Sequence, residues 1–302
     1  MPKLSVIILN YNTRDYIVRC LGSIEEQNLD ISSGSLEVIV ADNGSTDGSS
    51  EKIRKGFPWV KLIENKRNIG FAAGNNRAIR KAKGELLLLL NSDTVVLPDA
   101  FEKLVKFMDE RTDAGAVTGK LVLPDGAIDL SCHRGSPTPW NAFTYFVKLE
   151  QLFPNSPFFS GYHQTWKDFD AIHEVDAISG ACFMVRTKVV EQVGLLDERY
   201  FMYAEDLDWC MRIRDKGWKI YYDPEATVIH FKKRSGRKKD EGKQLTDKTK
   251  KIRSVTTTYF NDTMQLFYDK HYKDKYPLFL RKLVFTGIWL FGKIRTLRSR
   301  WH

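Results

Sequence analysis

The sequence has few of the residues that define several classes of protein. Its four cysteines are far apart and form no C-x-x-C pair or Cys/His cluster. This spacing argues against a zinc site or a disulfide framework and favours a reducing cytosol. The first residues show no charged segment followed by a long apolar segment and a cleavage site of small residues, so we expect no secretory signal. The uncharged run at 283–292 is too short to cross a bilayer, which needs about 20 apolar residues.

What the sequence does contain is enough for a folded core and a separate basic tail. Hydrophobic residues make up 42% of the 302 positions and aromatic residues 12%, which excludes global disorder. Residues 1–230 carry 27 Lys and Arg against 32 Asp and Glu, whereas residues 231–302 carry 20 against 6. The tail therefore has its own positive charge, which suggests an anionic partner, either a membrane surface or nucleic acid.

Strands and helices are expected to alternate through the first part of the chain. Hydrophobic runs predict strands at 4–9, 36–41, 60–63 and 86–90, the last a run of five leucines. Helical periodicity predicts helices at about 14–27 with Thr13 as the cap, after Gly48, through 78–82, and from Pro98. Four strand–helix repeats are typical of a mostly parallel sheet.

Polar residues end three of these strands. Asn10 follows the first, Asp42 the second, and Asn91 and Asp93 the leucine strand. Because βα loops of parallel strands open on one edge, these side chains are expected to converge there. A carboxylate at Asp42 can bind a ribose hydroxyl or a ring NH, and one at Asp93 can hold a divalent cation on diphosphate oxygens. The alternative is that they are ordinary turn formers.

Two further features carry possible chemistry. Glu205 and Asp206 open a predicted helix after an apolar, aromatic run, 200–203. Acids beside an apolar wall tend toward raised pKa values, as a general base requires, although acids also favour helix N-termini for electrostatic reasons alone. His230 closes a predicted strand, and it is either structural or a ligand that complements the single carboxylate of Asp93.

The remaining segments are predicted more coarsely. Strands are expected at 116–123, 177–186, 219–222 and 226–230, with loops and short helices at 131–170 that face an acceptor. The tail contains a basic run at 232–239, a helix at about 252–271, and the apolar run at 283–292 with Trp289 and flanking cations. This last run is typical of an interfacial membrane helix, the alternative being a helix packed on the domain.

Seven motifs in order resemble family 2 glycosyltransferases of the GT-A fold, in the branch with bacterial rhamnosyltransferases. They are VIILNYN at 6–12, VADNGSTDG at 40–48, NIGFAAGNN at 68–76, NSDT at 91–94, SGACFMVR at 179–186, the run 201–212, and His230. The resemblance implies an α/β, Rossmann-like, mostly parallel sheet flanked by helices. It covers a catalytic domain at 1–232, with a nucleotide-sugar half at 1–115 and an acceptor half at 116–232. Residues 233–302 form a basic helical extension.

The resemblance also implies an inverting transfer of one sugar from a dTDP- or UDP-sugar to a glycan acceptor that is lipid-linked. Asp206 would be the base, with Glu205 beside it, and Asp93 and His230 would hold Mg²⁺ or Mn²⁺. The residues implied for the nucleotide sugar are Asn10, Asn12, Asp42, Asn68, Gly70, Asn75, Asn91 and Ser92. Those implied for the acceptor side are Trp209, Gly180 and Ala181. Asn91 departs from the family's Asp-x-Asp form.

Other functions fit the sequence less well. Processive polysaccharide synthases carry a Gln-x-x-Arg-Trp motif and transmembrane helices that this sequence lacks, which favours single-sugar transfer. A catalytically silent sugar-binding module would lose the base, yet Glu205 and Asp206 are present. A nucleic-acid binder acting through the tail would leave the acidic strand ends unexplained, so we expect no nucleic acid. We expect a cytoplasmic protein, peripheral on the inner face of the cell membrane.

Overall fold

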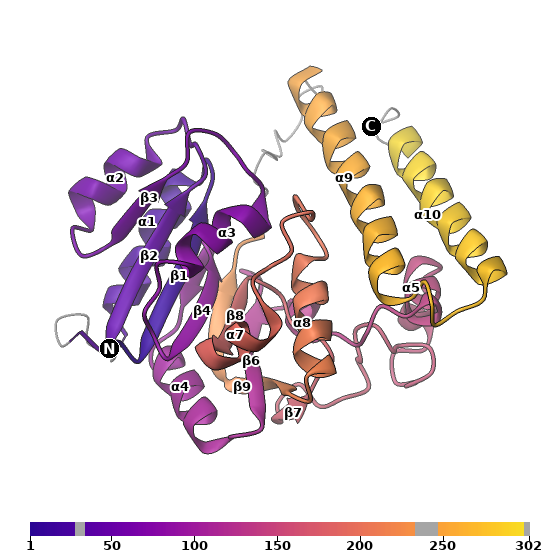
Figure 1. Ribbon diagram of the computed structural model, residues 1–302, viewed down its shortest axis with the longest axis horizontal. Coiled ribbons are helices and arrows are strands. Elements are labelled where there is room, and N and C mark those ends of the chain that lie inside the picture. The colour runs from indigo at the N-terminus through magenta and orange to yellow at the C-terminus, as the bar shows by residue number, and fades with distance from the viewer. Residues whose placement is uncertain (28–33, 233–246, 299–302) are drawn as a thin grey trace.

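One mixed sheet lies between layers of helices in the computed structural model, which describes residues 1–27, 34–232 and 247–298 (Figure 1). The strand order is β3-β2-β1-β4-β8-β6-β9-β5, and β7 pairs with β9. The strands are β1 (Leu4–Asn10), β2 (Leu36–Asp42), β3 (Lys61–Glu64), β4 (Leu86–Asn91), β5 (Thr94–Val96), β6 (Ala114–Val122), β7 (His173–Glu174), β8 (Cys182–Arg186) and β9 (Lys219–His230). The helices are α1 (Arg14–Glu25), α2 (Ser49–Gly56), α3 (Phe71–Ile79), α4 (Ala100–Glu110), α5 (Pro139–Phe146), α6 (Leu149–Leu152), α7 (Thr187–Val193), α8 (Glu205–Asp215), α9 (Asp247–His271) and α10 (Leu278–Arg298), with a 3₁₀ turn at Leu130–Cys132.

The first four strands are parallel, as predicted. β1 pairs in parallel with β2 and β4, and β2 with β3. The five leucines of β4 are at most 2% exposed, because β1 and β8 flank the strand and helices cover its faces. A strand without polar alternation is thus buried on both faces. The parallel half brings the polar strand ends to one edge of the sheet.

The second half of the sheet is mixed. β8 runs antiparallel to both β4 and β6, β6 runs parallel to β9, and β5 and β7 pair antiparallel with β9. The prediction of two short strands at the end was wrong, because 219–230 is one strand whose register with β6 shifts between Gly119 and Lys120. α3 begins at Phe71 and ends at Ile79, earlier than the helix expected through 78–82, and β5 and α7 were not predicted. Thr13 caps α1 only by position, since its hydroxyl donates to Asn10 Oδ1.

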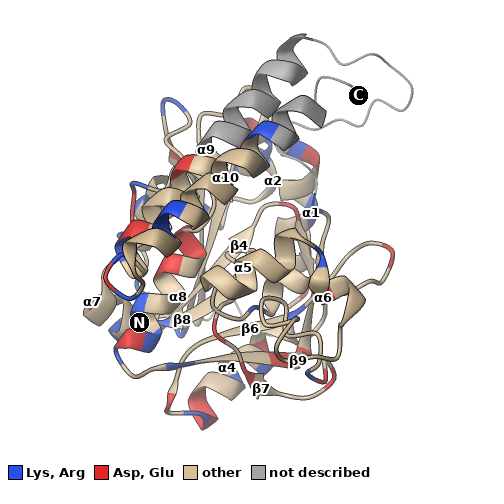
Figure 2. Ribbon diagram, turned by 90° about the vertical axis from the view of Figure 1, so that its right-hand side faces the viewer, with Lys and Arg blue, Asp and Glu red and all other residues tan. Residues whose placement is uncertain are grey.

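The two C-terminal helices lie against each other beside the sheet domain (Figure 1). The last two turns of α9 are packed on the domain, where Phe267 and Tyr268 are each 4% exposed, as is Tyr272 just after the helix. α10 lies on the same side of the molecule as α5 in Figure 1, and Figure 2 shows α10, α5 and α6 on the face toward the viewer. Residues 233–246 and 299–302, which include most of the predicted basic run, lie outside the described residues.

Candidate active site

The polar ends of β1, β2 and β4 meet at one edge of the sheet, as predicted. The register places Asn10 opposite Asp42, and Leu9 opposite Asn91. We call the residues at these ends and in the turns after them the strand-end cluster: Asn10, Asn12, Asp42, Ser45, Asn91, Ser92 and Asp93. In this position, outside the carboxyl ends of parallel strands, α/β proteins bind their ligands.

Asp42 organises its own loop. Its carboxylate is 2% exposed and accepts hydrogen bonds from Asn10 Nδ2 at 2.7 Å and from the backbone N–H groups of Gly44 and Ser45 at 3.1 and 2.8 Å. Asn12 lies in the left-handed region, and its Oδ1 accepts from the Thr46 N–H at 2.8 Å. The loops after β1 and β2 are therefore joined before any ligand arrives, which preorganises this edge.

The loop at 68–70 docks on a distant turn. Asn68 Oδ1 accepts from Asn43 Nδ2 and from the Gly70 N–H, each at 2.9 Å. Gly70 has φ +94°, and a Cβ there would lie 2.7 Å from the Phe201 carbonyl oxygen, so glycine is required. The next N–H, that of Phe71, donates to the same carbonyl at 2.6 Å. Through this contact the loop touches the turn that leads into α8.

Asn75 and Ser92, both implied for the nucleotide sugar, make hydrogen bonds within the protein. Asn75 is 2% exposed, and its Nδ2 donates to the Phe71 carbonyl within α3. Ser92 is also buried, with its hydroxyl hydrogen-bonded to that of Thr13 at 2.8 Å. Asn75 is therefore a helix residue, and Ser92 ties the β4 turn to the start of α1.

Asp93 faces His230 across the edge of the sheet. His230 Nε2 lies 3.4 Å from both Asp93 Oδ1 and Asn91 Nδ2, while Nδ1 is 2.8 Å from Asp129 Oδ2. Lys232 Nζ lies 2.6 Å from the other oxygen of Asp129. Burial lowers the pKa of His230, but the hydrogen bonds to Asp129 and Asp93 outweigh it and raise the pKa to about 9. Burial likewise opposes ionisation of Asp129, yet His230 and Lys232 hold its pKa well below the ordinary value.

These groups fit a divalent cation only together with a substrate. Within the described ranges, no group of three or more His, Cys, Asp and Glu side chains could hold a metal ion. Mg²⁺ typically binds through one or two carboxylates plus substrate phosphates, so Asp93 with a diphosphate is a reasonable donor set. The Asp129 contact to Nδ1 is the kind of support that orients a ligating histidine through its other nitrogen. His230 would bind after losing its Nε2 proton.

The first turn of α8 presents the acidic pair beside an arginine. Asp206 Oδ2 accepts from Arg134 at 2.7 Å, and Arg134 also donates to the Ile178 carbonyl at 2.7 Å. We call Arg134, Glu205 and Asp206 the α8 cluster. Tyr203 and Ala204, just before the helix, have φ of +75° and +65°. Such left-handed, non-glycine residues cost about 1–3 kcal/mol and often occur at functional sites.

Glu205 is the more buried acid of the pair. It is 6% exposed, and its Oε2 has no hydrogen-bond partner. Burial, with a smaller contribution from the Asp206 charge, raises the pKa of Glu205 to about 8. The α8 cluster therefore holds the Glu205 carboxyl, with its raised pKa, beside the Asp206–Arg134 contact.

Three residues implied for the acceptor side lie within the protein. Trp209 is 0% exposed, packs on Phe183 with ring centroids 5.1 Å apart, and donates from Nε1 to the Gly194 carbonyl. The implied contact of its side chain with an acceptor is wrong, because α8 turns this face into the core. Gly180 and Ala181 are buried, and a Cβ at Gly180 would lie 3.1 Å from the Phe71 ring. Gly180 and Ala181 thus pack the start of β8.

A cavity of about 450 Å³ lies away from these clusters, at the far end of α8. A second cavity, of about 420 Å³, is lined by partners of Asp206 and of Asp129. Its wall includes Arg134, which holds Asp206, and Lys232, which pairs with Asp129 next to His230. The rest of the wall consists of Ile128, Leu130, Ser131, Tyr145, Tyr162 and His163. The polar and aromatic lining suits a polar ligand with apolar faces.

Sequence reasoning missed Arg134, Asp129 and Lys232. Arg134 and Asp129 come from the irregular segments around the 3₁₀ turn, where no periodicity assigns a position, and Lys232 was read only as part of the basic run. The one usable signal was indirect. A buried acidic pair needs a basic side chain beside it, and none had been predicted next to Glu205 and Asp206.

Comparisons with known proteins agree with this geometry. The profile described as glycosyl transferase family 2 matches residues 5–169. An N-acetylglucosaminyl-diphospho-decaprenol L-rhamnosyltransferase of Mycobacterium tuberculosis is 30% identical over 244 residues, 77% of each chain. The low-salt glycan biosynthesis hexosyltransferase Agl10 of Haloferax volcanii is 28% identical over 239 residues, 76% of this chain and 67% of that one. A mannosyltransferase structure from Pyrobaculum calidifontis, in complex with GDP-Man and Mn²⁺, superposes with a TM-score of 0.59 at 18% identity, over 99% of this chain and 73% of that one.

The chain belongs to glycosyl transferase family 2. It has the GT-A fold and is a nucleotide-sugar glycosyltransferase, with relatives named for glycan and O-antigen biosynthesis. Related structures contain Mn²⁺, consistent with use of a divalent metal by enzymes of this fold. No helix in the described part of the chain has the length and apolar character needed to span a membrane.

Proposed function

We propose that this enzyme transfers one sugar, rhamnose or a related hexose, from a dTDP- or UDP-sugar to a hydroxyl of a lipid-linked glycan, with inversion. The observation that carries the proposal is the 420 Å³ cavity whose wall contains the partners of both Asp206 and the His230–Asp129 pair. The name of the mycobacterial relative supports the choice of sugar and of a lipid-linked acceptor. A donor and an acceptor that met in this cavity would lie between a diphosphate site and a base.

On the donor side, the strand-end cluster would hold the nucleotide sugar. Asp42, with Asn10 and Asn12, would bind the nucleoside, and the loop of Asn68 and Gly70 would close over it. Asp93, with His230, would hold Mg²⁺ or Mn²⁺ on the diphosphate, where the cation would neutralise charge on the leaving group. Asn91 and Ser92 would set the position of Asp93 by their place in the same turn.

On the acceptor side, Asp206 would take the proton from the attacking hydroxyl. Displacement in line with the leaving diphosphate needs a base on the opposite face of the sugar, and the Asp206 carboxyl group is already held in place by Arg134 at 2.7 Å. Glu205, neutral at pH 7, would keep a second negative charge away from the leaving group.

We further propose that the protein lies on the inner face of the cell membrane through residues 233–302, outside a catalytic domain at 1–232. α10 exposes large apolar side chains, at 47–73% of their area, and cations lie among them. They are Leu278, Phe279, Leu283, Trp289 and Leu290, with Lys282 and Lys293. Lys293 Nζ sits 4.2 Å from the Trp289 ring centroid. An apolar face with cations favours an anionic bilayer surface.

A donor screen tests the proposed function directly. Release of nucleoside diphosphate would be followed from dTDP-, UDP- and GDP-sugars, with and without an N-acetylglucosaminyl-diphosphoryl lipid. We expect acceptor-dependent release from a dTDP- or UDP-sugar. Release from GDP-sugars alone, or none that depends on the lipid, would contradict the proposed donor or acceptor.

A further inference from the structure

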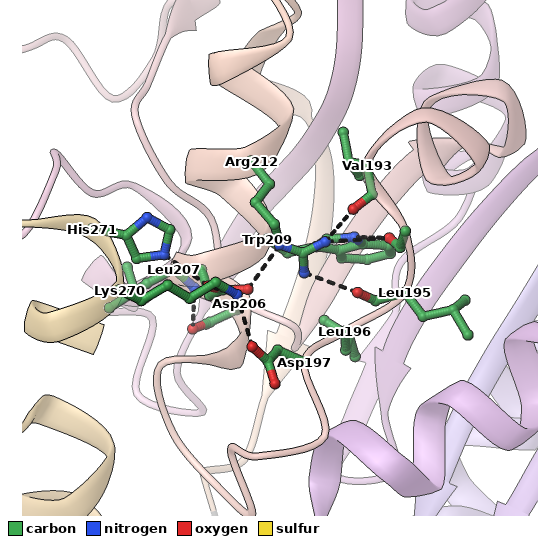
Figure 3. A network of polar contacts seen from close by, with 12 residues as sticks. Val193, Leu195, Leu196, Asp197, Asp206, Leu207, Trp209, Arg212, Lys270 and His271 are labelled. Atoms are coloured by element: carbon green, nitrogen blue, oxygen red, sulfur yellow. Dashed lines mark hydrogen bonds and ion pairs between the residues drawn. The ribbon is translucent and has the colours of Figure 1, made fainter. Parts of the chain in front are cut away.

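A buried carboxylate on α8 is held by the C-terminal helix α9. Asp208 is 0% exposed and lies two residues after Asp206. Its Oδ1 is 2.7 Å from His271 Nε2 and 2.6 Å from Lys270 Nζ, and its Oδ2 accepts from Arg212 at 2.9 Å. Figure 3 shows Lys270 and His271 reaching from α9 toward α8. A carboxylate buried without these donors would be costly, so the contacts fix the distance between the two helices.

Lys270 also links α8 to the loop before it. The same ammonium lies 2.7 Å from Asp197 Oδ2, and Arg212 donates to the carbonyls of Val193 and Leu195 (Figure 3). Asp197 precedes Glu198, which accepts from Asn76 of α3 at 2.9 Å. The loop 193–199 is therefore bonded to α3, α8 and α9 at once.

A second contact lies just ahead of the acidic pair. Tyr259 of α9 stacks on Phe201, with centroids 4.6 Å apart and planes 14° apart. Phe201 is also the residue whose carbonyl receives the Phe71 N–H, beside Gly70. The left-handed residues Tyr203 and Ala204 follow it after Met202. Backbone in this region persists only when its surroundings hold it, and α9 supplies part of those surroundings.

We propose that α9 is a positioning element of the active site: Lys270 and His271, acting through Asp208, and Tyr259, acting through Phe201, set the place of Asp206 relative to the donor. All three lie beyond the residues matched by the family profile, 5–169. The inference rests on the proposed role of Asp206 as base. A displacement of about 1 Å at a reacting group can cost about 10²-fold in rate, so loose docking of α9 would be felt in turnover.

The test uses the full chain with Lys270→Met and His271→Leu combined, and a soluble acceptor analogue. We expect kcat to fall by about 10- to 100-fold, with the donor Kd from calorimetry changed by less than about twofold. Lys270→Arg with wild-type His271 should stay close to wild type, because it keeps the charge. Lys106→Met, on the exposed side of α4, is the matched control for loss of a lysine.

The same substitutions in an Asp206→Asn background separate this proposal from the proposed function. If α9 acts through Asp206, the double substitution should cost little there, because coupled residues are not additive. If Lys270→Met/His271→Leu keeps the wild-type kcat while Asp206→Asn is inactive, the positioning role of α9 is refuted and the role of Asp206 as base stands. An equal fall in donor affinity and kcat would also refute the positioning role of α9, because it would indicate that the whole domain is less rigid. Full activity of Asp206→Asn would instead refute the base.

Discussion

The strand-end cluster and the α8 cluster are built in different ways. In the strand-end cluster, neighbours satisfy each other: Asp42 alone accepts from Asn10, Gly44 and Ser45. In the α8 cluster, Glu205 Oε2 and Arg134 Nε are buried without a partner, and the Asp206 contact comes from a residue 72 positions away. The first cluster is preorganised for binding, whereas the second keeps groups whose protonation and partners can change, as proton transfer requires.

The largest effect on turnover is expected from loss of Asp93, which is proposed to hold the cation on the donor diphosphate. Asp93→Ala removes the one carboxylate proposed to hold the cation, so turnover should fall by about 10³-fold. The midpoint of thermal unfolding should stay close to that of the wild type, because Asp129 still pairs with His230. Nucleotide release and a melting curve check this. Asp15→Ala, an exposed acid on α1, is the control. Full activity in EDTA would contradict the assignment.

The next effect separates the members of the α8 cluster. Asp206→Asn keeps the shape and removes the basicity, so kcat should fall by about 10²-fold with donor affinity retained. Glu205→Gln should cost far less, because Glu205 is neutral at pH 7. Steady-state kinetics on both variants is the measurement. An inactive Glu205→Gln beside an active Asp206→Asn would exchange the two roles.

A smaller effect concerns stability and pH. Burial raises the pKa of Glu205 from 4.5 to about 8, so the folded protein holds a proton that the unfolded chain releases. Stability from this group is therefore fully present below pH 4.5 and is lost as pH rises toward 8, with a slope of at most about 1.4 kcal/mol per pH unit. Glu205→Gln should flatten the fall in unfolding free energy between pH 5 and 8, measured by urea titration. Parallel curves for variant and wild type would show that Glu205 is ionised in the fold.

The smallest effect on chemistry is expected from the tail's last helix. Deleting residues 277–302 removes α10 and its exposed apolar face, so the protein should leave anionic vesicles while donor binding and slow donor hydrolysis persist. Sedimentation with phosphatidylserine vesicles at low and high salt tests this. Equal pelleting of both proteins would mean that α10 is only part of the fold.

The same contrast explains how much the sequence could predict. The strand ends were predictable because parallel pairing sets the register of Asn10, Asp42 and Asn91 from local hydrophobic runs. The mixed half was not, because β8 inserts between β4 and β6 from residues about 90 positions later than β4. The sequence pattern therefore predicted the side chains at the edge of the sheet, but it did not predict those that reach the site from distant parts of the chain.

Individual residues show the limits more closely. Arg134 lies in a segment without periodicity, so its contact with Asp206 had no sequence signal. The resemblance implied an acceptor contact for Trp209, but α8 buries its side chain completely, against Phe183. The docking of α9 depends on Asp208, which charge pattern alone places equally well at a solvated helix start.

We propose that Asp93, in the strand-end cluster, and Asp206, in the α8 cluster, act in the same transfer reaction. The most direct measurement is acceptor-dependent release of nucleoside diphosphate from the best donor, compared among wild type, Asp93→Ala and Asp206→Asn. We expect the wild type to release nucleoside diphosphate. Asp93→Ala should lose both donor binding and turnover, and Asp206→Asn should lose turnover alone. Wild-type release by either variant, at matched folded protein, would contradict it.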